Sequence, residues 1–106
     1  MLASLAAEKK ARRPKLLNVR HITSYTDFIL LVTAGSDRHA RGLADHIVEE
    51  MKKHRVRVYG IEGYETGQWI LLDYGDTIVH ILQADVRTYY DLDGLWVDAE
   101  QLPVEE

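Results

Sequence analysis

The first residues that could do chemistry are Gly35 and Ser36, which separate an apolar run from an amphipathic stretch. A glycine and a serine between a strand and a helix can bring a phosphate to the N-terminus of that helix. Nucleotidyltransferases combine such a pair with two carboxylates one residue apart on the next strand, where they hold Mg²⁺. The strand expected next, residues 56–61, contains no carboxylate. Transferase chemistry is therefore disfavoured and stands only as an alternative.

Two other groups of carboxylates come close to the required pattern. Asp91 and Asp93 have the spacing of a metal-binding pair, but they fall in a segment that is not expected to be a strand. Asp73 and Asp76 lie on either side of a turn and do not form such a pair. The carboxylates therefore predict no magnesium site.

The histidines offer two further kinds of site. His39 and His46 lie seven residues apart on the predicted long helix, which separates them by about 10 Å along its axis. Two ligands of one zinc ion are typically four residues apart, so we expect no metal and no cofactor. The residue types of a hydrolase triad are present in Ser36, His39 or His80, and Asp73, but the sequence has no nucleophile elbow. No residue is assigned as catalytic, and we do not expect an enzyme.

Residues 69–82 predict a β-hairpin, because two apolar runs flank Gly75 and Asp76. A two-residue loop that begins with glycine suits the turns whose twist matches the flanking strands. The register that follows sets these residues opposite one another: Tyr74 and Thr77, Asp73 and Ile78, Leu72 and Val79, Leu71 and His80.

The two faces of this hairpin differ, because successive side chains of a strand point to opposite sides. One face is wholly aliphatic and suffices as core: Ile70, Leu72, Val79 and Ile81. The other is interrupted by an acid and an imidazole: Trp69, Leu71, Asp73, Ile78, His80 and Leu82. We expect a partner to be met there, by Trp69, Leu71, Asp73, Tyr74, Asp76 and His80, with Arg38 and His39 as further members. The alternative is that Trp96 or Tyr90 rests on Trp69 and covers it.

The elements that must position these residues follow from periodicity. Apolar residues at helical spacing predict a helix from residue 37 to 54, and the unbroken apolar run 28–34 predicts a central strand. Strands at 15–20 and 56–61 complete a sheet with the hairpin, and 84–90 forms one or two helical turns. The expected fold class is α/β, a mixed five-stranded sheet with helices packed on it. It forms a single domain, 1–106, with a short N-terminal helix (1–13) and an acidic C-terminal tail (98–106).

Composition narrows the classes of function. The chain has no cysteine, which excludes a disulfide framework and thiolate metal sites and favours the cytosol. Its net charge of −4 disfavours general binding to phosphate backbones and suits a basic protein partner. The N-terminal apolar residues are too few for a signal peptide or a membrane span, so no membrane partner is expected.

One local feature departs from this acidic balance: the basic cluster Lys9, Lys10, Arg12 and Arg13. It could contact nucleic acid, or it could provide favourable charge at the C-terminal end of a helix stopped by Pro14. The second interpretation is preferred.

Several short motifs resemble one known family. They are Ser36-Asp37-Arg38-His39, Ala44-Asp45-His46, Glu62-Gly63, Trp69 to Asp76, Val79-His80, and Tyr90-Asp91-Leu92 with Leu95-Trp96. Together they resemble the ribosomal silencing factor, or Iojap-like, family, from about Lys9 to Trp96.

The resemblance implies a nucleotidyltransferase-like fold that lacks the catalytic carboxylates. It implies a translation repressor that binds protein fourteen of the large ribosomal subunit where the small subunit docks. Such binding blocks subunit joining when nutrients are scarce. It also implies a possible homodimer and a bacterial cytoplasmic or organellar location, without sequence-specific binding to nucleic acid. A nucleotidyltransferase-like enzyme and a small RNA-binding module are the alternatives.

Overall fold

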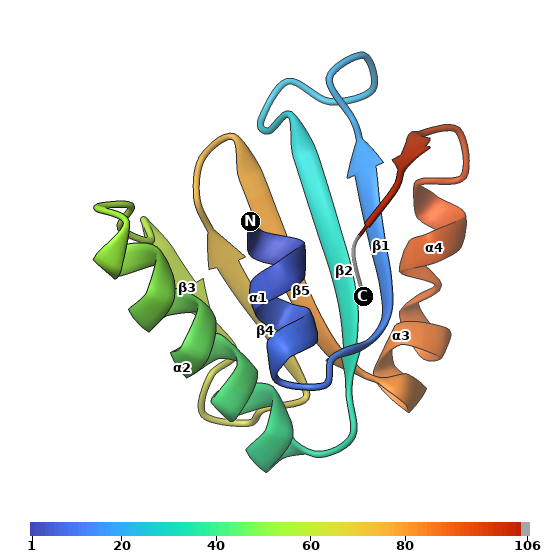
Figure 1. Ribbon diagram of the computed structural model, residues 1–106. Coiled ribbons are helices and arrows are strands. Elements are labelled where there is room, and N and C mark those ends of the chain that lie inside the picture. The colour runs from blue at the N-terminus through green and yellow to red at the C-terminus, as the bar shows by residue number, and fades with distance from the viewer. Residues whose placement is uncertain (105–106) are drawn as a thin grey trace.

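A mixed sheet of six strands, in the order β3-β4-β5-β2-β1-β6, runs through the computed structural model, which describes residues 1–104 (Figure 1). The strands are β1 (Arg12–Asn18), β2 (Phe28–Ala34), β3 (Gly60–Glu62), β4 (Trp69–Asp73), β5 (Thr77–Gln83) and β6 (Glu100–Leu102). The helices are α1 (Leu2–Glu8), α2 (Asp37–Lys53), α3 (Ala84–Tyr90) and α4 (Leu92–Leu95). The expected mixed α/β architecture is confirmed. None of these four helices has the length and apolar content that crossing a bilayer requires.

Strand β2 lies inside the sheet, as its unbroken apolar sequence predicts. It pairs parallel with β5 and antiparallel with β1, and every residue from Ile29 to Ala34 is buried. Side chains on both faces are therefore covered, which requires an apolar residue at nearly every position.

Helix α2 covers one face of the sheet together with α1, and both lie in front of the strands in Figure 1. Ser36 begins α2 as its N-cap, since its hydroxyl accepts a hydrogen bond from the backbone N–H of His39 at 3.0 Å. Leu43, Ile47 and Met51 are buried at the predicted helical spacing. They pack with the aliphatic face of the hairpin in the larger of two cores.

The opposite face of the sheet is covered only in part. A smaller core there joins Leu17, Leu31 and Leu82 to Leu92 of α4, and α3 packs on β5 and β2. On the same face, Leu71 and Asp73 of β4 are only half-buried. This uneven cover leaves one part of the hairpin accessible.

Three expectations about element bounds were wrong. The sheet has six strands rather than five, because residues 100–102 of the expected acidic tail pair with the free edge of β1. The N-terminal helix ends at Glu8, and β1 then passes through Pro14 at a register shift between Arg12 and Lys15. Proline has no N–H for the ladder, so it is tolerated in a strand at such an irregularity.

The third difference is β3, which forms three residues of strand at the sheet edge instead of the expected run 56–61. The last acidic residues, Glu105 and Glu106, lie outside the described part of the chain.

Candidate functional site

The hairpin that carries the candidate site has the predicted register. Leu71 lies opposite His80, Leu72 opposite Val79 and Asp73 opposite Ile78. Gly75 has φ of +83°, and the N–H of Asp76 donates a hydrogen bond to the carbonyl of Tyr74 at 3.1 Å, which is the pattern of a γ-turn centred on Gly75. The turn therefore decides which side chains share a face.

We name as the hairpin face the side chains of β4 and β5 that point away from α2: Trp69, Leu71, Asp73, Ile78 and His80. Trp69 donates a hydrogen bond from its indole N–H to Nδ1 of His80 at 3.0 Å. That nitrogen must be unprotonated to accept it. Burial lowers the pKa of His80 to about 4, which keeps the ring neutral at physiological pH. The pair is thus a fixed, uncharged centre of the face.

Two tyrosines of α3 extend the hairpin face beyond the sheet. The ring of Tyr90 lies 5.1 Å from that of Trp69, and Tyr89 meets Tyr90 edge to face at 4.9 Å. Tyr90 is 55% exposed and Tyr89 is 81% exposed. The alternative that Tyr90 rests on Trp69 is therefore correct in part, but Trp69 is only half-buried and the covering ring is itself accessible.

Sequence reasoning did not place Tyr89 and Tyr90 in the site. A signal was present, because Val86 and Tyr90 are four residues apart and share one side of a helix. Val86 packs on the same small core as Trp69. The helix therefore turns Tyr90 towards the hairpin.

The two acids of the hairpin have different surroundings. Asp73 is half-buried and accepts a hydrogen bond from the backbone N–H of Gly75 at 2.8 Å, so it also stabilises the turn. The side chain of Asp76 is exposed, while its carbonyl accepts hydrogen bonds from the N–H groups of Asp27 and Phe28. Asp76 is thus the acid that is freely available at this margin.

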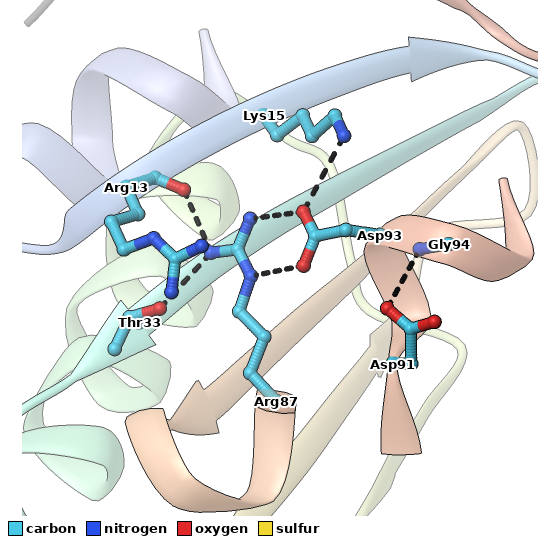
Figure 2. A network of polar contacts seen from close by, with 7 residues as sticks. All are labelled: Arg13, Lys15, Thr33, Arg87, Asp91, Asp93 and Gly94. Atoms are coloured by element: carbon cyan, nitrogen blue, oxygen red, sulfur yellow. Dashed lines mark hydrogen bonds and ion pairs between the residues drawn. The ribbon is translucent and has the colours of Figure 1, made fainter. Parts of the chain in front are cut away.

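A buried arginine holds α3 and α4 in place beside the hairpin face (Figure 2). Arg87 is 2% exposed and binds both carboxylate oxygens of Asp93, at 2.8 and 2.9 Å. It also donates to the carbonyl of Arg13 at 2.8 Å and to the hydroxyl of Thr33 at 3.0 Å. Arg87 holds the pKa of Asp93 down to about 2. Since Tyr90 is three residues from Arg87, this network also positions Tyr90.

Three residues assigned to the site from the sequence are not on the hairpin face. Tyr74 is 6% exposed and packs in the larger core, because it lies two residues after Leu72 and so points to the same side. Arg38 and His39 lie in the first turn of α2, which packs on the opposite face of the sheet. The expected placement of Tyr74 on the hairpin face was wrong, whereas the role of Arg38 and His39 in binding a partner stays a prediction.

The remaining residues considered for chemistry have structural partners. Asp91 caps α4 by accepting a hydrogen bond from the N–H of Gly94, and Asp93 binds Arg87. His46 lies 2.9 Å from a carboxylate oxygen of Glu8. His39 accepts from the N–H of Gly35 and contacts the carbonyl of Lys9. These side chains thus connect elements of the fold.

Comparison with known proteins shows which family this sequence resembles. The chain matches over residues 1–106 the family described as "Ribosomal silencing factor during starvation". It is 33% identical to the ribosomal silencing factor RsfS of Halalkalibacterium halodurans over 98 residues, 92% of this chain and 84% of that protein. It is 28% identical, over 91% of this chain and 43% of the relative, to a mouse protein named "Mitochondrial assembly of ribosomal large subunit protein 1".

Solved structures agree as well. A crystal structure of a protein from Bacillus halodurans superposes with a TM-score of 0.85 and 30% identity, over 97% of this chain and 94% of that one. The match of sequence and fold extends over both the hairpin and the helices around it. The chain therefore belongs to the family of ribosomal silencing factors.

Proposed function

We propose that this protein represses translation by binding protein fourteen of the large ribosomal subunit with its hairpin face and with Tyr89 and Tyr90. Membership of the silencing family and the name of the mouse relative, which refers to the large subunit, support this partner class. Occupation of that surface excludes the small subunit sterically, so repression needs no chemical step.

The observation that carries the proposal is the uneven cover of the sheet. Trp69, Leu71 and Tyr90 form an accessible apolar centre, although the larger core is already complete on the other face. Protein interfaces combine such an aromatic centre with a polar margin. Asp73 and Asp76 provide an acidic margin, which complements a basic ribosomal protein and steers its approach.

Under this proposal the degree of repression depends on the concentration of the factor relative to its Kd for the large subunit. The fraction of large subunits that remain free to join decreases as the concentration of the factor rises above that Kd. The site of action is the compartment that holds the ribosomes, which is the bacterial cytoplasm or an organelle.

The test is a subunit-joining assay with purified ribosomal subunits, together with calorimetric titration of isolated protein fourteen. Tyr90→Ala removes an aromatic ring from the centre of the interface, and we expect affinity to fall by about 30-fold, the effect of a typical hot spot. Leu71→Ala should weaken binding by a smaller factor. Asp73→Asn removes the charge but keeps the oxygen that accepts from Gly75, so it separates binding from turn stability.

A matched control is Ile61→Ala. Ile61 is also an exposed aliphatic residue of this sheet, 43% exposed, but it lies opposite Leu72 and so faces the α2 side. We expect this variant to bind and to block joining as the wild type does. If folded Tyr90→Ala and Leu71→Ala variants also act like the wild type, the hairpin face is not the binding site.

A further inference from the structure

A second surface is formed where the turn between α1 and β1 meets the start of α2. We name it the basic patch and define it by Lys9, Lys10, Arg12 and Arg38. The backbone N–H of Gly35 donates to Nδ1 of His39, so Nε2 carries the proton and donates to the carbonyl of Lys9 at 2.8 Å. The guanidinium of Arg12 lies against Gly35, where an added Cβ would be 3.7 Å from its Nη2. These contacts bring residues from three elements to one place.

The charges of the basic patch are not neutralised by the described residues. Segments 8–13 and 35–41 contain six lysine and arginine residues against two acids, Glu8 and Asp37. Both acids already have partners, since Glu8 binds His46 and Asp37 lies 3.8 Å from Arg41. All four patch residues are exposed, and none forms an ion pair within residues 1–104. Their positive charge is directed at solvent.

Stabilisation of a helix end does not account for this cluster. Helix α1 ends at Glu8 and has no basic residue in its last turn. Lys9 and Lys10 follow that end, but Arg12 already belongs to β1 and Arg38 stands near the N-terminus of α2. A positive charge at a helix N-terminus is unfavourable, because that end carries the positive pole of the helix dipole. The patch therefore adds positive potential to a positive helix end.

We propose that the basic patch binds the phosphate backbone of folded RNA. Phosphate groups are the anions that lysine, arginine and helix N-termini hold together without reading bases. A protein partner is less suited, because the centre of an interface between proteins is rich in aromatic side chains and depleted of lysine. No large apolar side chain is exposed in segments 8–13 and 35–41, both of which are fully described.

The acidic net charge of the chain does not oppose this binding. Exposed charges act over a Debye length of about 10 Å at 0.1 M salt, so a phosphate at the patch responds mainly to charges close by. The acids of the hairpin lie at the margin of a different face of the sheet. The protein thus presents an acidic margin on one face and a basic surface on the other.

This proposal goes beyond the proposed function and does not depend on it. The patch adjoins the α2 side of the sheet, whereas the hairpin face points away from α2. If both proposals hold, the RNA is ribosomal RNA beside the docking site, and the two faces bind different components of one subunit.

The experiment measures fluorescence anisotropy of a labelled RNA duplex of about 20 base pairs, titrated at several salt concentrations. The wild type should bind with a log–log salt slope of several units, as expected for several phosphate contacts. The triple variant Lys9→Gln, Lys10→Gln and Arg12→Gln should reduce that slope by about three and affinity at 50 mM salt by at least 10-fold. It should still bind isolated protein fourteen, which separates this proposal from the previous one.

The matched control is Lys52→Gln, Arg55→Gln and Arg57→Gln, which removes the same charge near the other end of α2, about 25 Å away. We expect this control to retain most of the RNA affinity. Circular dichroism and thermal melting verify that both triple variants are folded. If both triple variants lose RNA affinity equally, or if the variant of Lys9, Lys10 and Arg12 binds RNA as the wild type does, the basic patch is not the RNA-binding site. Unlabelled RNA should also displace the labelled duplex better than polyglutamate does. If polyglutamate displaces it equally well, the ligand of the patch is an acidic protein and not RNA.

Discussion

Replacing Arg87 by methionine tests whether the buried network of Figure 2 positions the helices beside the hairpin face. Methionine keeps a long unbranched side chain but removes the guanidinium, and with it the bonds to Asp93, Thr33 and the carbonyl of Arg13. The Arg87 side chain is 2% exposed, so no water replaces these bonds without a local opening.

Breaking a buried ion pair by removing one partner costs about 3 to 5 kcal/mol. Asp93 is 28% exposed and keeps Lys15 at 3.5 Å, so its carboxylate can regain water and retains one cation. We therefore expect a loss at the lower end, about 3 kcal/mol of unfolding free energy. Native domains have a free energy of unfolding of about 5 to 15 kcal/mol, so the variant should still fold.

The pH dependence of the loss gives a second, independent signature. The pKa of Asp93 is held at about 2 against an ordinary 3.8, so the folded state releases its proton more readily than the unfolded chain. The stabilisation is complete above about pH 5 and is lost as pH falls through 3.8 towards 2. Allowing for its partial exposure, we assign it about 1 to 2 kcal/mol.

The assay is urea unfolding followed by tryptophan fluorescence at pH 7, 5 and 3. Since Arg87 is the main cause of the lowered pKa, the gap between wild type and Arg87→Met should narrow by roughly 0.5 to 1 kcal/mol between pH 5 and 3. Lys15→Met serves as the control and should cost less than about 1 kcal/mol, as a partly exposed pair does. A loss below about 1 kcal/mol for Arg87→Met, or a gap that does not change with pH, would refute the reasoning.

Two further predictions concern the hairpin. The hydroxyl of Tyr74 is buried without a hydrogen-bond partner among the described residues. Tyr74→Phe should therefore leave the free energy of unfolding unchanged or raise it by up to about 1 kcal/mol, which a thermal melt detects as an equal or higher Tm. A clear drop in Tm would contradict this and indicate a partner for the hydroxyl. Burial lowers the pKa of His80, so protons favour the unfolded chain below pH 6.5 and stability should fall as pH drops from 6.5 to 4. His80→Gln should show a smaller fall, and an unchanged pH profile would contradict this role.

The hairpin and α2 could be predicted from the sequence, because both depend on local spacing. A glycine at the start of a two-residue loop and a period of two are enough to define the register of β4 and β5. A period of 3.6 with Ser36 in front is enough for α2. Strict alternation would also have placed Tyr74 in the core, since it follows Leu72 by two residues.

The remaining features depend on contacts between distant parts of the chain. β6 has three residues and forms only because the edge of β1 is free to pair with it, more than 80 residues away in sequence. The arginine network joins residues separated by 54 and 74 positions, and no local pattern encodes such a partner. Tyr90 reaches Trp69 because this network and the small core orient α3.

The sequence by itself therefore determined which face of the hairpin is core and which is half-polar. Only the tertiary structure decided that Tyr90 extends the half-polar face, that α2 packs on the other side of the sheet, and that Lys9 and Arg12 meet the start of α2. The physical reason is that alternation and helical period are set by backbone geometry within a few residues. Which residues from distant parts of the chain become neighbours depends instead on which apolar surfaces bury one another.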